Sequence, residues 1–197
     1  MNDDQWIQYT EADDRPREKA AFELLRERLP TWEPFRAWAN FKFWSLDGAY
    51  FDVHTLVFSP AGVFLVEFAP YRGRLDIGSD LWIHTKQNGE VESYNSPLTV
   101  AAHKAQKLRA LLEEMVPGSK YHAPQIQPVV FLTEPDVEVD VDSDAGGGLF
   151  YHPDREDEHP SIIDALVDGQ GPGIPELSGA LDDTALKRFE GLVDEAD

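Results

Sequence analysis

The sequence predicts an α/β (α+β) protein whose central mixed β-sheet is flanked by helices. Residues 50–58 and 63–68 are two runs of β-branched and aromatic residues separated by a turn at residues 59–62, which is typical of a β-hairpin. Residues 17–29 and 98–115 carry apolar side chains at helical spacing. Amphipathic helices that alternate with strands are expected to pack on a shared sheet.

The remaining elements are predicted in chain order. Residues 35–44, rich in aromatic rings, are expected to form a loop that leads into an opening strand, with the rings in the core. Residues 80–84 and 91–94 flank an Asn-Gly turn and are expected to extend the sheet. The later predicted elements are a strand at 127–133, an exposed edge strand at 137–141, a strand at 148–151 and a helix at 161–167.

The chain of 197 residues is long enough for one domain with a sizeable core. We predict a domain over residues 1–168 and a Gly/Pro linker over residues 169–181, where GQGPGIP breaks the pattern. Residues 182–197 have a helical pattern and are a candidate start for a further domain.

The composition excludes several classes of protein. No apolar run approaches the roughly 20 residues that cross a bilayer, so no membrane partner is expected. The chain has no cysteine, which excludes disulfides and cysteine-based sites, and its start lacks the pattern of a signal peptide, so a cytoplasmic location is expected. A net charge of −20 disfavours broad, non-specific DNA binding, although a local basic patch is compatible with it.

Common catalytic motifs are absent from the sequence. The six histidines form no His-Glu-x-x-His motif, and Gly146-Gly147-Gly148 lacks the Lys-Ser/Thr of a phosphate-binding loop, so these glycines are predicted to form a hairpin turn. There is no Gly-x-Ser-x-Gly motif and no set of protein-kinase motifs.

A carboxylate closes the second strand of the central hairpin. Glu67 follows an almost unbroken apolar run, and alternation places it on one face of its strand with Ala69. By the same alternation Asp52 and His54 share a face of the first strand. Pairing of the two strands is therefore expected to let Asp52, His54 and Glu67 converge.

These segments resemble the NERD (nuclease-related) domain, a branch of the PD-(D/E)XK nuclease-like superfamily. In that pattern an acidic-x-Asp strand precedes a strand ending in Glu-x-Lys and a Lys/Arg-Gly turn. Residues 52–54, 67–69 and 71–75 correspond to them here. The resemblance covers residues 18–132 and implies a PD-(D/E)XK-like sheet.

The resemblance narrows to the module that precedes the serine/threonine kinase domain in phage growth limitation (bacteriophage exclusion, BREX) defence proteins. Three segments carry it: the Glu-x-x-Ala-x-x-x-Leu-Arg-x-x-Leu-Pro opening, Asn-Phe-x-Phe, and the Asn-x-Pro-Leu start of a Lys-bearing helix.

The sequence departs from the family pattern at two chemically important positions. His54 stands where the resemblance implies a metal-binding Asp, and Ala69 stands where it implies a catalytic Lys; Glu67 is intact. Losing an anionic ligand and a stabilising positive charge is expected to cost several decades of rate.

Two functions follow from the resemblance. We favour a catalytically degenerate NERD-like domain, a regulatory module that binds protein or DNA in an antiphage defence protein, with no cofactor and with other defence proteins as partners. The alternative is an active DNA endonuclease using Mg²⁺ or Mn²⁺. In that case Asp52, His54, Glu67 and Glu18 are the expected metal ligands, and Glu67 and Lys104 the expected catalytic residues, with Lys104 substituting from its helix for the missing lysine. The expected nucleic-acid contacts are a patch of Arg72, Arg74, Lys104 and Lys107. Glu18 is also consistent with a surface residue that compensates the dipole of the first helix.

Overall fold

Two mixed sheets and three helices make up the computed structural model, which describes residues 1–10, 15–115, 123–155, 159–175, 186–187, 189–191 and 193. The six-stranded central sheet has the order β1-β2-β3-β4-β8-β10: β1 (Trp6–Gln8), β2 (Arg36–Trp44), β3 (Tyr50–Ser59), β4 (Gly62–Ala69), β8 (Ile126–Leu132) and β10 (Leu149–Tyr151). The four-stranded second sheet has the order β7-β6-β5-β9: β5 (Arg74–Ile77), β6 (Leu81–Thr85), β7 (Val91–Asn95) and β9 (Glu138–Val141). The helices are α1 (Pro16–Arg28), α2 (Pro97–Glu114) and α3 (Ile162–Asp168).

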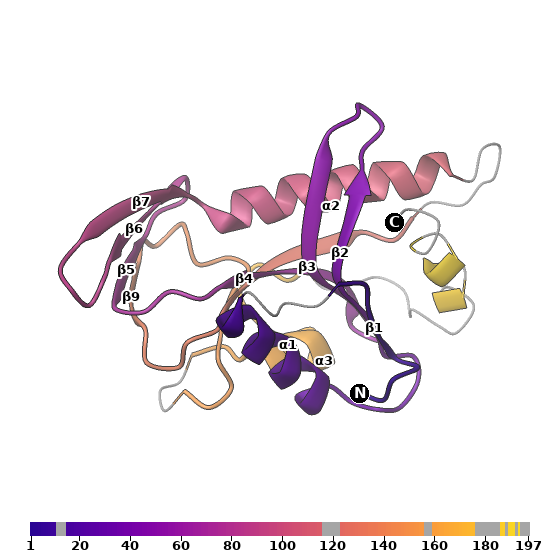
Figure 1. The fold of residues 1–197 in the computed structure, drawn as a ribbon, viewed down its shortest axis with the longest axis horizontal. Helices are drawn as coiled ribbons and strands as arrows, with labels where there is room; N and C mark the ends of the chain where they lie inside the picture. Colours follow the sequence, from indigo (N-terminus) through magenta and orange to yellow (C-terminus); the bar gives the residue numbers. More distant parts are fainter. Residues whose placement is uncertain are drawn as a thin grey trace.

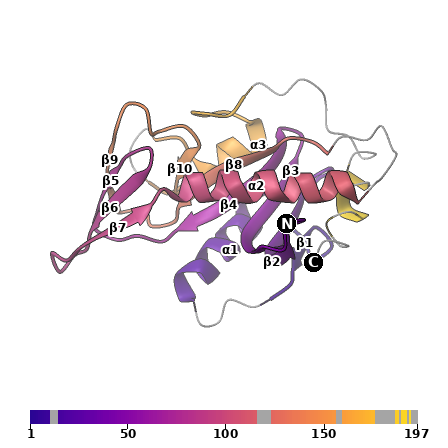
Figure 2. The same cartoon turned by 90° about the horizontal axis from the view of Figure 1, so that it is seen from above.

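Helices cover both faces of the central sheet (Figure 1). α1 and α3 pack on one face, where Phe22 and Leu166 share a cluster with Phe64. α2 packs on the other, where Leu108 meets Leu65. The second sheet lies near the start of α2 (Figure 2). The predicted fold class, a mixed sheet flanked by helices, is confirmed. No described helix is both long and apolar enough to cross a membrane.

The central hairpin forms as predicted and occupies the middle of the sheet. β3 and β4 pair antiparallel from Ser59 and Gly62 to Thr55 and Val66, and β4 pairs parallel with β8 along its length. Every residue of β4 is buried. Because both neighbours of β4 are strands and both of its faces are covered, a charged side chain at its end, such as that of Glu67, has little access to water.

Three local predictions were wrong. Residues 35–44 are not a loop that leads into a strand, since nine of them form β2. The expected burial of the rings holds for Phe35, Trp38, Phe41 and Phe43, whereas Trp44 is exposed. β6 and β7 do not extend the central sheet: in the second sheet β6 pairs with β5, and β7 pairs with β6. Gly146–Gly148 do not form a hairpin turn, since β9 and β10 on either side belong to different sheets. The short strand β1 was missed.

Asn40 interrupts the alternation of β2 and β3. Its φ is +52°, and its side chain donates a hydrogen bond to the carbonyl of Thr10. On the N-terminal side of this point Trp38 faces α2, and on the far side Phe41 does so, although a regular strand would turn the two to opposite faces. Leu56 and Val53 show the same change on β3. Beyond Asn40, β2 and β3 therefore turn toward α2 the side chains that a regular strand would place on the opposite face of the sheet.

The described residues beyond α3 pack on the same body. The backbone N–H of Gly148 donates to the carbonyl of Pro172 at 2.7 Å. Phe189 lies edge-on to Trp38, with ring centroids 5.6 Å apart. Residues 176–181 of the predicted linker, and 182–185, 188, 192 and 194–197 of the predicted helical segment, lie outside the described part.

Gly73 is predicted to be intolerant of a side chain. Its φ is +100°, and a Cβ atom there would lie 2.4 Å from the carbonyl oxygen of Thr85. Gly89 is a matched control, with φ of +83° and open space around a Cβ atom. We expect Gly89→Ala to lose about 1–2 kcal/mol of unfolding free energy from backbone strain alone. Gly73→Ala should lose about 1–3 kcal/mol more from the clash, as measured by urea unfolding; equal losses would contradict this.

Candidate active site

A buried ion pair joins β4 to α2. Lys104 Nζ lies 2.9 Å from Glu67 Oε1, and the side chains are 9% and 8% exposed. Lys104 lies on the same face of α2 as Ala101 and Leu108, which pack on the sheet. Each charge is therefore held away from water chiefly by the other, and such a pair is stable only while both partners remain.

His54 connects Glu67 to helix α1. Its Nδ1 lies 3.0 Å from Glu67 Oε2 and 3.3 Å from the backbone nitrogen of Phe68, while its Nε2 lies 3.6 Å from Glu18 Oε2. With a proton on Nδ1 the ring donates to Glu67, and without it the ring accepts from the Phe68 N–H. The ring also stacks on that of Phe68, with centroids 5.0 Å apart. Its orientation is thus fixed on several sides.

Glu18 is held in place by a cation from the start of its own helix. Arg15 Nη1 lies 2.6 Å from Glu18 Oε2, and Arg15 Nη2 donates to Asn40 Oδ1 at 3.2 Å. Glu18 therefore faces His54 rather than open solvent, with 16% of its side chain exposed. Arg15 and Asn40 were missed at the sequence level; an Asn inside an otherwise aromatic strand was the available signal for the second.

Asp52 does not join this group. The β3–β4 ladder ends at Thr55 and Val66, so β3 has left β4 before Asp52 is reached. Asp52 is exposed, pairs across the sheet with Lys42, and forms no hydrogen bond or ion pair with the described residues. Alternation along β3 alone predicted convergence with Glu67, but the end of the ladder keeps Asp52 apart.

The donor set does not fit a divalent ion as it is arranged. Both oxygens of Glu67 are engaged, one by Lys104 and the other by His54. The imidazole lies between the carboxylates of Glu67 and Glu18, so they cannot share one ion at the roughly 2.0–2.6 Å that Mg²⁺ or Ca²⁺ requires. The described part of the chain holds no group of three or more His, Asp or Glu side chains arranged to hold a metal.

The four predicted nucleic-acid contacts are all paired with carboxylates. Lys104 binds Glu67, and Lys107 Nζ lies 2.7 Å from Asp47 Oδ2, a hydrogen bond that lowers the pKa of Asp47 to about 2. Arg74 is the first residue of β5 in the second sheet, and Arg72 lies in the segment just before it. The full set of pairs is Arg72–Glu134, Arg74–Asp76, Arg74–Asp140, Lys104–Glu67 and Lys107–Asp47.

Glu134 is a further buried acid that was not singled out from the sequence. It accepts a hydrogen bond from Arg72, which raises the pKa of that guanidinium, and it lies 3.8 Å from Arg17 Nε on α1. The available signal was its position two residues after the end of β8, a strand rich in apolar residues.

The mixed sheets flanked by helices are consistent with a PD-(D/E)XK-like fold, and comparison with known proteins agrees with this class. The family model described as the nuclease-related domain (NERD) matches residues 14–133, more than half of the chain. The chain therefore belongs to the NERD family. All the residues of the Glu67 site lie within the matched range.

The chain is similar to a short part of a much longer protein. The chain is 32% identical over 120 residues to the probable kinase PglW of Streptomyces coelicolor. The match covers 61% of this chain but 8% of the relative, so the chain spans a small part of that protein's length. No solved structure matches the chain.

Lys104→Met is predicted to destabilise the protein strongly. It leaves the Glu67 carboxylate buried without its ammonium partner, a loss of about 3–5 kcal/mol in urea unfolding. Lys107→Met, three residues along the same helix, removes an exposed pair and should have little effect.

The double variant Glu67→Gln with Lys104→Met completes a mutant cycle for this pair. It should lose less than the sum of the two single variants, because neither buried charge remains. Additive losses, or a loss from Lys107→Met as large as that from Lys104→Met, would show that the pair is not buried and coupled as described.

Proposed function

We propose that this chain is a catalytically degenerate NERD module, which acts as a regulatory interaction module in an antiphage defence protein. One observation carries the proposal: Lys104 and His54 engage the two oxygens of the carboxylate that the family pattern retains. A carboxylate satisfied in this way by its own chain has a structural role, connecting β4, α2 and, through His54, α1.

The two departures from the family pattern support the same conclusion. His54 replaces an anionic metal ligand with an imidazole, and hard cations such as Mg²⁺ select oxygen ligands. Ala69 lies in an apolar cluster with Leu75 and Trp82, where the pattern has a lysine. Removing a preorganised charge from a catalytic site typically costs two or three decades of rate, so two such losses are rarely compensated.

The charge distribution favours a protein partner over DNA. The net charge is −20, and Arg72, Arg74, Lys104 and Lys107 are each balanced by a nearby carboxylate. DNA affinity depends on lysines and arginines that are free to replace counterions along the phosphate backbone. The balanced cations therefore offer DNA little electrostatic attraction.

The place of the module in a larger protein is inferred from its relative. The match covers part of a protein named as a probable kinase. We propose that this module likewise belongs to a longer defence protein and lies N-terminal to a serine/threonine kinase domain. Its role would then be to connect that kinase to a partner.

A cleavage assay tests the loss of nuclease activity. We expect the purified protein to leave linear, supercoiled and single-stranded DNA intact with either Mg²⁺ or Mn²⁺, because the Glu67 carboxylate is engaged by Lys104 and His54. Metal-dependent cleavage by the wild-type protein that disappears in Glu67→Gln would overturn the proposal and favour an active nuclease that uses Lys104.

A variant that restores the family pattern tests whether His54 and Ala69 account for the proposed loss of nuclease activity. His54→Asp with Ala69→Lys restores the family pattern beside the retained Glu67, and gain of cleavage by this variant alone would support the proposal. Because Ala69 is buried, the variant must first retain the wild-type near-ultraviolet circular dichroism spectrum. His54→Asp alone, with Lys104 in place, is the variant to use if the double change does not fold.

A further inference from the structure

The second sheet leaves one of its faces open. Side chains alternate along β6, so Trp82 is buried while Leu81 and Ile83 point outward and are 47% and 40% exposed. Val91 of β7, 60% exposed, shares this outer face because it pairs with Thr85. Exposed aliphatic residues that gather on one face often mark a site of protein association.

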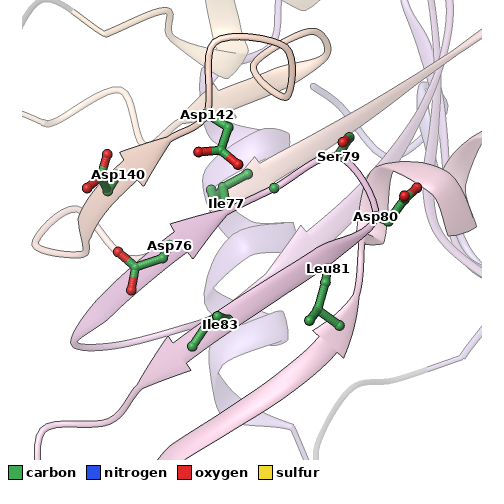
Figure 3. A pocket seen from close by; sticks show the side chains of 9 residues that line it. Asp76, Ile77, Ser79, Asp80, Leu81, Ile83, Asp140 and Asp142 are labelled. Atoms are coloured by element: carbon green, nitrogen blue, oxygen red, sulfur yellow. The ribbon is translucent and has the colours of Figure 1, made fainter.

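Acidic side chains border Leu81 and Ile83 (Figure 3). Asp76 of β5 is the cross-strand partner of both Ile83 and Asp140, so these three side chains form a row across three strands on the outer face. The residues that line a hollow of about 520 Å³ at this place include four aspartates and the two exposed aliphatic side chains of β6: Asp76, Asp80, Asp140, Asp142, Leu81 and Ile83.

The negative charge of this face is only partly balanced. Arg74 donates to Asp76 at 2.8 Å and to Asp140 at 3.0 Å, so one cation serves two carboxylates. Asp80 and Asp142 form no ion pair with the described residues. The hollow therefore combines exposed aliphatic surface with excess negative charge.

We infer that this outer face, which we call the acidic–aliphatic face (Asp76, Asp80, Leu81, Ile83, Asp140 and Asp142), binds a basic, aliphatic-bearing segment of a partner protein. Aliphatic side chains of that segment pack on Leu81 and Ile83, and its Lys or Arg side chains pair with the aspartates. DNA and anionic membranes are repelled by the same charges, and a second copy of this chain would bring like charges together.

The spacing of the face fits an extended segment. Neighbouring strands are about 4.8 Å apart, so the acids of β5 and β9 lie about 5 and 10 Å from the aliphatic column of β6. In an extended segment, side chains two positions apart lie on one side at about 7 Å. A segment with the pattern aliphatic-x-basic that crosses the strands can therefore reach both kinds of side chain at once.

A defined peptide can test the face directly. The probe is a synthetic Leu-Ser-Lys-Ser repeat, titrated into the ¹⁵N-labelled chain and followed by NMR. We expect saturable shifts concentrated in β5, β6 and β9, and an affinity that falls about tenfold in Ile83→Ser and in Asp142→Asn. An Ala-Ser-Lys-Ser peptide of equal charge should bind more weakly, because it lacks the aliphatic contact.

Matched variants separate this face from general charge attraction. Val100→Ser removes an aliphatic side chain of similar exposure on α2, and Glu27→Gln removes an exposed carboxylate on α1. Neither should change the affinity, and each variant should keep the wild-type melting temperature. Equal binding of the alanine peptide, equal effects of the control variants, or a DNA duplex that shifts the same resonances would overturn the inference.

The inference rests on the proposed role as an interaction module, but different experiments would contradict the two. If the wild-type protein does not bind the peptide, the acidic–aliphatic face is not the docking surface, and the proposal that the Glu67 site is catalytically degenerate is unaffected. DNA cleavage by the wild-type protein would overturn the degenerate site without changing the peptide result.

Discussion

The buried pair of Glu67 and Lys104 constrains the structure around it. Glu67 lies two residues before the end of a strand that is buried along its length, so its charge must be balanced by a cation from the chain or by one from solvent. Lys104 of α2 supplies this cation, and the ion pair holds the helix against the C-terminal part of β4. The cation that satisfies the carboxylate also covers the oxygen that a metal ion would need.

His54 extends this constraint to the other side of the sheet. Its imidazole lies between Glu67 and Glu18, and Arg15 connects Glu18 to Asn40. Elements on both faces of the central sheet thus meet at one polar network. Protein side chains, rather than a shared metal ion, contact these carboxylates here. Under the proposed function, the family scaffold would be retained while its chemistry is lost.

Much of the fold was predictable because apolar periodicity is a local property of the sequence. The hairpin, the helices and the placement of Glu67 followed from alternation and helical spacing. Asp52 shows where such reasoning fails, since its separation from Glu67 depends on where the β3–β4 ladder ends. The second sheet was missed because β6 and β7 alternate in the same way whichever sheet they join. The pairing of Lys104 with Glu67 depends on how α2 lies across the sheet, which no local pattern encodes.

Paramagnetic broadening by Mn²⁺ gives the most direct test of the closed site. With Lys104 and His54 on its oxygens, Glu67 should bind no metal, so millimolar Mn²⁺ should broaden resonances around exposed acidic residues and produce no saturable broadening centred on His54, Glu67 and Phe68. Selective, saturable broadening at these three residues in the wild-type protein, lost in Glu67→Gln, would show that the carboxylate is open to a metal and would contradict a degenerate site.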